Sequence, residues 1–193
     1  MSDAQADYIA LPVYRDELGA ALGFTPPDLE ANRQGRLGQS QEATWFRLFF
    51  RSAAKSGISL LVAIGALALA FSGGIAGVLG VTLLIVAATF LAFIGINAWY
   101  MLPAWRDVNA GVVSTVEGLV RPAERETRIP MGSGLSTVMW SYYWVVDGQQ
   151  RFWVPGKAYP LLIPARHRIY FLPSSRRIVA AEPITGTTSQ AGG

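Results

Sequence analysis

The chain has 193 residues, of which 51% are hydrophobic and only 15% are charged, against about a quarter in typical soluble domains. It contains no cysteine and one histidine, which excludes disulfides, thiolate chemistry and zinc sites built from several Cys or His ligands. The net charge of +3 is modest and no dense Lys/Arg block occurs, so nucleic acid is not an expected partner.

Residues 1–40 are expected to form a cytoplasmic segment of short helices. The N-terminus lacks the basic-then-apolar order of a cleavable signal peptide, so the first apolar span is predicted to act as an uncleaved anchor. One helix is predicted over 14–23. The next begins at Thr25, which can cap it together with Asp28 three residues later, and ends near the glycine at position 35 or 38. Ser40 is the candidate cap of the helix that follows.

Residues 41–105 are predicted to form an interfacial helix and then a hairpin of two transmembrane helices. No charged residue or histidine occurs in the 50 residues from Ser56 to Trp105, which is enough for two spans of ~20 residues each. We place the spans at about 53–71 and 76–100. A buried hairpin of a soluble protein is disfavoured, because the flanking segments are too small to cover it. Uncharged spans favour an anchor or a subunit over a pump.

Aromatic and basic side chains flank the two spans, as is typical of helices that enter a membrane interface. Because basic residues precede the first span and follow the second, the positive-inside rule places both termini in the cytoplasm. We expect a bacterial inner (plasma) membrane. The predicted interface residues are Trp45, Phe46, Arg47, Phe49, Phe50, Arg51, Lys55, Trp99, Tyr100 and Trp105.

Two further features concern how the spans pack and end. Small residues four positions apart, at Ala66/Ala70 and at Ala88/Ala92, are predicted to let the helices approach closely. Pro103 is predicted to end the second helix, because proline lacks the N–H that a helix interior requires.

Residues 106–183 are predicted to form a small cytoplasmic β-domain, and 184–193 a disordered tail. Short segments rich in β-branched and aromatic residues predict a small, partly open five-stranded barrel of SH3-like or OB-like kind. The polar stretch 122–136 is predicted to be a long loop. The predicted strands are 111–120, 137–146, 149–154, 166–171 and 177–181.

Asp147-Gly148 predicts a two-residue turn, which sets the register of the hairpin around it. One face would then collect Met139, Tyr143, Val145, Phe152 and Val154, and the other Trp140, Tyr142, Trp144, Arg151 and Trp153. We assign the first face to the core, which leaves the second as a candidate interaction surface with a cation–π pair between Arg151 and Trp144. A longer turn would shift the register and undo this assignment.

The aromatic surface could be covered in three ways: by the protein's own N-terminal helices or loop, by another protein, or by the bilayer surface. A second candidate surface could contact lipid headgroups or an acidic partner, although such residues commonly remain solvated. It consists of Arg166, His167, Arg168, Arg176 and Arg177. His167 itself is expected to be an exposed strand residue.

No catalytic, cofactor-binding or metal site is predicted. Ser52-x-x-Lys55 matches the Ser-x-x-Lys pattern of penicillin-recognising enzymes, but lies at the membrane entry without its companion motifs. The expected function is a non-catalytic accessory or scaffold subunit of a membrane complex, with membrane lipids and a protein as partners. The alternative is a membrane-anchored sensor or regulatory module that binds a small ligand or lipid headgroup near Arg166–Arg177; a deep pocket lined by Tyr143, Tyr170 or Trp140 would favour it. A membrane enzyme ranks last.

Overall fold

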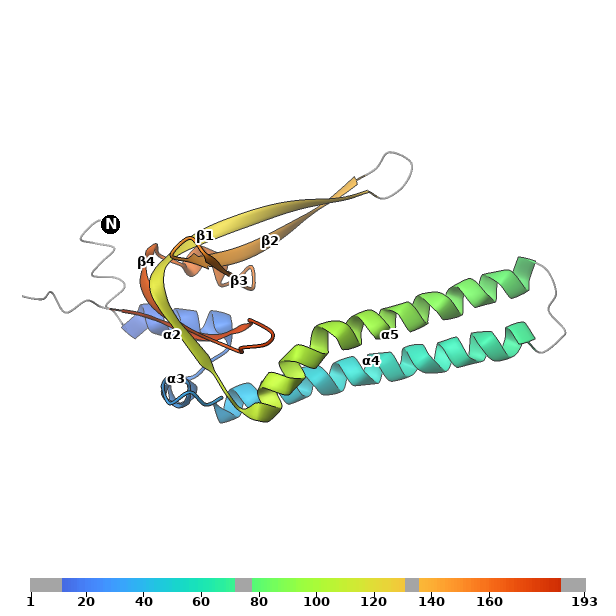
Figure 1. The fold of residues 1–193 in the computed structure, drawn as a ribbon, viewed down its shortest axis with the longest axis horizontal. Coiled ribbons are helices and arrows are strands. Elements are labelled where there is room, and N and C mark those ends of the chain that lie inside the picture. Colours follow the sequence, from blue (N-terminus) through green and yellow to red (C-terminus); the bar gives the residue numbers. More distant parts are fainter. Residues whose placement is uncertain (1–11, 72–77, 131–135, 185–193) are drawn as a thin grey trace, which may run out of the picture. The chain divides into compact units, whose positions relative to one another are not determined.

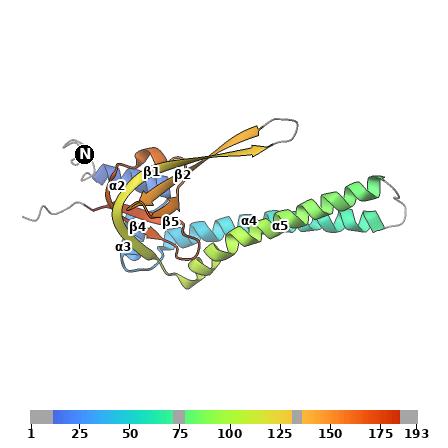
Figure 2. The ribbon, with the colours of Figure 1, turned by 45° about the horizontal axis from the view of Figure 1, so that its top comes forward.

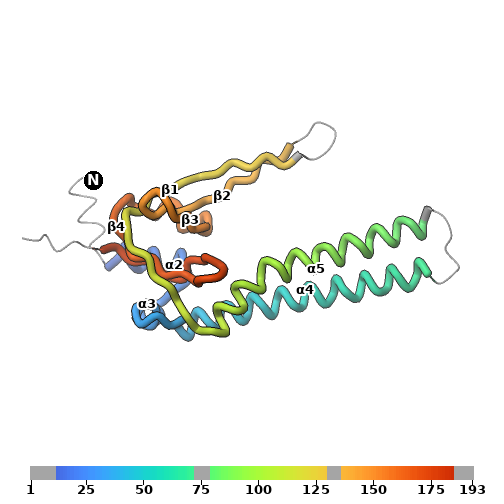
Figure 3. Tube along the Cα trace, viewed as in Figure 1, coloured from blue at the N-terminus to red at the C-terminus, as the bar shows by residue number. Residues whose placement is uncertain are grey.

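The computed structural model describes residues 12–71, 78–130 and 136–184 (Figures 1 and 3). They form two compact units, one of residues 43–109 and one that combines the described parts of 1–42 and 110–193. The predicted turn between the spans and, except for Ile184, the predicted disordered tail lie outside the described residues. The helices are α2 (Pro12–Leu22), α3 (Pro26–Arg33), α4 (Gln39–Phe71), α5 (Val78–Ala110) and the short 3-10 helix η1 (Tyr159–Leu161).

The helical unit is a pair of long apolar helices, α4 and α5, of 33 residues each. At 1.5 Å per residue each is about 50 Å long, which exceeds the ~30 Å thickness of a bilayer's hydrocarbon core. In their most apolar 18-residue stretches only 17% and 6% of the residues are buried, whereas the core helix of a soluble protein is mostly buried. Both helices are therefore long and apolar enough to cross a membrane.

Alanines form the seam between the two long helices. Ala63 and Ala66 of α4 and Ala87 of α5 are buried, and larger apolar side chains pack around them. Ala66 therefore lies in the seam, as its spacing predicts. The prediction for Ala88 and Ala92 is wrong, because both are exposed. Spacing identifies small residues but does not set the rotation of a helix about its axis, and α5 turns the neighbouring Ala87 inward.

Pro103 does not end the second helix, which continues to Ala110. The missing N–H of a proline removes one intrahelical hydrogen bond. Packing beyond the proline compensates for it, since the Trp105 ring lies edge-on to Phe46 and Phe49, with centroids 5.8 and 5.0 Å away. Such aromatic pairs are worth about 0.5–1.5 kcal/mol beyond the area they bury.

The β-strands form one antiparallel sheet in the order β3-β2-β1-β4-β5. The predicted barrel is wrong, because the sheet is open: in the described residues β3 and β5 lie at opposite edges and do not pair. Each of the five predicted strands overlaps an observed one. The strands are β1 (Ser114–Pro130), β2 (Ser136–Val146), β3 (Gln150–Trp153), β4 (Ala165–Phe171) and β5 (Ile178–Pro183).

The long loop predicted over 122–136 is also wrong, because residues 122–130 belong to β1 and Ser136 begins β2. β4 pairs with β1 over 114–120 and β3 with β2 over 143–146, and the Val154 N–H also donates to the Tyr142 carbonyl. Beyond this point, in the described chain, 125–130 and 136–141 pair with each other alone. The segment 124–130 with 136–142 is therefore two-stranded except at its base. This two-stranded segment, here called the ribbon, projects from the sheet (Figure 2). Within the described residues only the base of the ribbon packs on another element, so its β1 half, 124–130, needs no apolar alternation and does not show the pattern of a strand.

The N-terminal helices belong to the same unit as the sheet. As predicted, Thr25 caps α3, and its side chain and backbone N–H exchange hydrogen bonds with Asp28 in a capping box. The Ser40 prediction is wrong. α4 already begins at Gln39, and the Ser40 hydroxyl and N–H both donate to the Asp28 carboxylate instead. A Cβ on Gly38 would lie 2.1 Å from Asp28 Oδ1, so only glycine fits there.

Candidate functional site

The turn between β2 and β3 lies where it was predicted, but the register that follows it is different. Asp147 and Gly148 both have positive φ, and the Gln149 N–H donates to the Val146 carbonyl, as in a two-residue turn. Gln149 is nevertheless an extra residue outside the ladder, so Val146 lies opposite Gln150. One inserted residue moves every following side chain to the other face.

The shifted register divides the predicted interaction surface. Trp144 lies opposite Phe152, and both are fully buried, with Val146 and Val154 beside them in the core. Phe152 and Val154 thus point inward as predicted, whereas Trp144 does not lie on the surface. The predicted cation–π pair with Arg151 is excluded, because Arg151 pairs with Val145 on the opposite face.

The remaining predicted surface residues are distributed over both faces. Trp153 is 53% exposed on the outer face, opposite Tyr143. Tyr142 lies on the inner face at the base of the ribbon and packs against Tyr159 of η1, with ring centroids 4.7 Å apart. Trp140, on the ribbon itself, is 50% exposed on the same face as Tyr142.

The two faces of the ribbon carry different charges, because side chains alternate along each strand. The inner face continues the face of Trp144, and on it Glu126 forms an ion pair with Arg128, 2.6 Å apart. The inner-face residues of the ribbon are Glu124, Glu126, Arg128, Val138, Trp140 and Tyr142. The outer-face residues are Arg125, Thr127, Ile129, Thr137, Met139 and Ser141.

His167 is buried, contrary to the prediction that it would be exposed. Its Nδ1 lies 3.1 Å from the Ala165 carbonyl, which can only accept, so Nδ1 carries the proton and Nε2 accepts from the Tyr14 hydroxyl at 3.1 Å. The Tyr14 oxygen accepts in turn from the Ile163 N–H. Alternation with buried Ala165 and Ile169 along β4 is the sequence signal that places His167 inside.

The neutral His167 makes the β-domain sensitive to acid. Burial lowers the pKa of its imidazole below the ordinary value of 6.5. At pH values between the lowered pKa of the folded state and the ordinary pKa of the unfolded chain, the folded state binds fewer protons than the unfolded chain. The free energy of unfolding therefore rises with pH in this range, and the contribution of His167 is fully present above about pH 7. We expect the melting temperature of the full-length protein to fall as pH drops from about 7 to 5, and His167→Gln to flatten this slope. Since His167 is the sole histidine, an unchanged slope in the variant would contradict this assignment.

The predicted basic cluster is not a single surface. Arg168 forms ion pairs with Glu117 at 2.5 Å and with Glu182 at 3.4 Å. Arg176 lies over the Phe152 ring, 5.6 Å from its centroid, and burial lowers the pKa of Arg177. Arg166 is exposed and forms no ion pair within the described residues. Of the five predicted residues, Arg166 is thus the one best placed to meet a partner.

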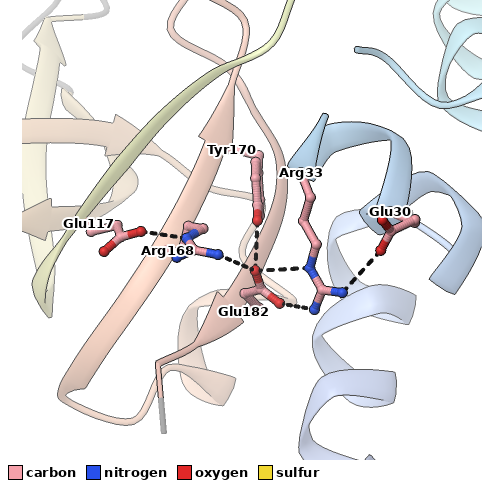
Figure 4. Close-up of polar contacts among 6 residues, drawn as sticks. All are labelled: Glu30, Arg33, Glu117, Arg168, Tyr170 and Glu182. Carbon is pink, nitrogen blue, oxygen red and sulfur yellow. Dashed lines mark hydrogen bonds and ion pairs between the residues drawn. The ribbon is translucent and has the colours of Figure 1, made fainter. Parts of the chain in front are cut away.

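Glu182 is the centre of a polar network that joins β4, β5 and α3 (Figure 4). Glu182 is 8% exposed, and its carboxylate accepts from Arg33, from Arg168 and, at 2.6 Å, from the Tyr170 hydroxyl. Burial alone would raise the pKa of Glu182, but the hydrogen bonds and charges of these partners hold it below its ordinary value. Burial and the bond to Glu182 raise the pKa of Tyr170 to about 12. The network therefore stabilises the fold, because internal partners occupy its charged groups.

A second polar cluster joins α3 to the start of α4. Asn32 and Gln41 are both buried and exchange two amide hydrogen bonds of 2.9 and 3.1 Å. Gln41 also donates to the Val179 carbonyl of β5 and accepts from the Gly38 N–H, and Asn32 donates to the Arg36 carbonyl. Sequence reasoning missed this pair, since amides at a helix boundary look like solvated polar residues.

The predicted interface residues lie on the part of α4 that precedes the alanine seam and on the part of α5 that follows it. One group packs between the helices: Trp45 lies over Phe49, with centroids 5.8 Å apart, and Phe49 contacts Trp105. Another group is turned outward. Its members are Phe50, Trp99 and Tyr100, which are 77%, 80% and 66% exposed. The basic residues Arg47, Arg51 and Lys55 are exposed on the same part of α4.

Comparisons with protein-family models, with curated proteins and with solved structures found no match to this chain.

Proposed function

We propose that this chain is an integral membrane adaptor: α4 and α5 span the bilayer, both termini lie in the cytoplasm, and the ribbon binds a protein partner. Membrane insertion is supported by the lengths of the two helices and by their exposed apolar surface. The cytoplasmic orientation is supported by Arg47, Arg51, Lys55 and Arg106, which flank the spans at the ends away from the connecting turn.

A non-catalytic role is supported by the partners of three buried ionisable groups in the unit that contains the sheet. Asp28 caps two helices, His167 bonds Tyr14 and a backbone carbonyl, and Glu182 bonds two arginines and a tyrosine. A general acid or base needs at least one position open to a substrate. Internal partners occupy these groups, which is typical of structural residues.

The observation that carries the adaptor proposal is the projecting ribbon. A two-stranded hairpin in water is marginally stable unless something packs against it. Beyond its base at Tyr142 this one extends for six residue pairs, or about 20 Å, and exposes Val138 and Trp140 side by side on its inner face. An exposed tryptophan beside an aliphatic residue, with charges at the rim, is the composition of a binding hot spot.

A photo-crosslinker tests this proposal in native membranes. With p-benzoylphenylalanine at Val138, ultraviolet light is expected to give one discrete protein adduct that sediments with alkali-washed membranes. The same label at Gln149, in the exposed turn, is expected to give none. Trp140→Ala should abolish the adduct, whereas Trp153→Ala, an equally exposed tryptophan on the outer face, should leave it intact.

The identified partner, tagged in turn, must retrieve the untagged chain but not its Trp140→Ala variant. Absence of an adduct at Val138 in a membrane-inserted, folded protein would exclude the ribbon as the partner site. Loss of the protein from alkali-washed membranes would exclude membrane insertion itself.

A further inference from the structure

The outer face of the sheet gathers arginines that have no acidic partner. Arg121, Val145 and Arg151 are paired across three neighbouring strands and so form one row. Arg125 lies four residues further along β1 on the same face, and Arg166 of β4 pairs with Leu119 of that face. All four arginines are exposed, and none forms an ion pair within the described residues. Arg121 and Arg151 thus flank Val145, and Arg125 and Arg166 extend the positive charge over the same face.

The nearest carboxylates do not neutralise this group. Glu117, on the same face of β1, is already paired with Arg168. Asp147, at the turn, accepts from the Leu119 N–H through Oδ1, and its Oδ2 lies on the side of the inner face, 2.3 Å from where a Cβ on Gly118 would stand. Glu124 and Glu126 project from the opposite face of the ribbon. The outer face is therefore cationic and the acidic side chains of the ribbon point away from it.

Aromatic and aliphatic side chains lie among these arginines. Tyr143 and Trp153 form the row next to Arg121 and Arg151, and Trp153 is half exposed. Met139, 49% exposed, lies beyond Arg125 on the same face. Arginine, tryptophan and tyrosine are the residues that favour the headgroup layer of a bilayer, and each basic residue adds attraction to anionic lipid.

We infer that this outer face, formed by Arg121, Arg125, Arg151, Arg166, Tyr143 and Trp153, binds the anionic headgroup layer of the bilayer that holds the two helices. The inference rests on the membrane insertion in the proposed function, but not on the protein partner. The chain enters the helical unit after Glu42 and leaves it after Asn109, so the spans keep the β-domain close to the bilayer at a high effective concentration. Binding through this face leaves Trp140 and Val138 on the face that points away from the lipid.

The absence of cysteine allows single-site labelling of the full-length protein. Ser141→Cys on the outer face and Trp140→Cys on the inner face are neighbours on β2 that point in opposite directions. Each carries a fluorophore and is reconstituted into nanodiscs of phosphatidylcholine alone or with about a third phosphatidylglycerol. Quenching by a neutral aqueous quencher then reports how far the headgroup layer shields each position.

The anionic lipid is expected to reduce quenching severalfold at 141 and to leave 140 unchanged. Salt at about 1 M, where the screening length is ~3 Å, should remove the protection. The triple variant Arg121→Gln/Arg125→Gln/Arg151→Gln should also lose it. The control variant Arg15→Gln/Arg128→Gln/Arg176→Gln removes the same number of positive charges outside the outer face and should retain the protection at 141.

Equal quenching at 141 in both lipids, in protein that elutes with the discs, would overturn this inference alone. Protein that fails to enter discs of either composition would instead overturn the membrane insertion on which it rests. A third outcome would be that anionic discs give no protection at 141 but an added oligonucleotide does. That result would overturn the lipid assignment in favour of nucleic acid.

Discussion

Replacing Trp144 by alanine is expected to destabilise the β-domain by about 3–5 kcal/mol, the usual cost of deleting a large buried aromatic side chain. Trp144 is fully buried beside Val146 and Phe152, so its removal leaves a cavity that the sheet cannot close by small shifts. The measurement is hydrogen exchange of the β4 amides in the full-length protein in detergent, because exchange there requires the sheet to open.

Two variants sharpen this test. Trp153→Ala is expected to change stability by no more than about 0.5 kcal/mol, because Trp153 is half exposed on the outer face. Trp144→Phe should cost much less than Trp144→Ala, since phenylalanine refills the site and removes an indole N–H that has no hydrogen-bond partner among the described residues. If Trp144→Ala cost no more than Trp153→Ala, the register with an extra residue at Gln149 would be wrong.

The sequence predicts those parts of this fold that local physics determines. Thr25 and Asp28 form a capping box wherever a helix starts there, and the Asp147-Gly148 pair takes the positive φ values of a tight turn. The long uncharged run predicts the two long apolar helices in the same way. These features depend mainly on residues that are close in the sequence, so tertiary contacts change them little.

The candidate site depends on longer-range choices, and there the prediction failed. One extra residue at Gln149 exchanged the faces of β2 relative to β3 and moved Trp144 from the surface to the core. Strand alternation turns His167 inward, but its hydrogen-bond partner, Tyr14, lies more than 150 positions away, where no local pattern could identify it. The sequence predicts a loop over the β1 half of the ribbon, because a strand without a core beside it needs no apolar alternation, whereas the β2 half lies within the predicted strand 137–146.

The charge difference between the two ribbon faces follows from the same register. Along β1, Glu124, Glu126 and Arg128 project from one face, while Arg121 and Arg125 project from the other. In the sequence the acidic and basic residues are mixed, and only the alternation of side chains along the strand separates them onto different faces. The two proposals, a protein on the inner face and lipid on the outer face, can therefore be tested independently by variants of the same strands.

Replacing Gln41 by alanine is expected to cost about 2–4 kcal/mol, although the residue stands at the start of a helix where a substitution is usually harmless. The change leaves the Asn32 side chain, the Gly38 N–H and the Val179 carbonyl each short of a buried hydrogen bond. Each unsatisfied buried group costs about 1–3 kcal/mol, reduced where water can enter. Hydrogen exchange of the β5 amides should report the loss, because Gln41 binds that strand directly.

Gln39→Ala is the matched control, because it removes the same side chain from an exposed position of the same helix. It is expected to stay within about 0.5 kcal/mol of the unmodified protein. Asn32→Ala should destabilise the protein about as much as Gln41→Ala. The loss of stability in the double variant should be smaller than the sum of the two single losses, by about 1 kcal/mol or more, because both substitutions remove the same reciprocal bonds. Strictly additive costs would mean that the two amides act separately. In that case the start of α4 would be held on β5 by the bond from Gln41 to Val179 alone.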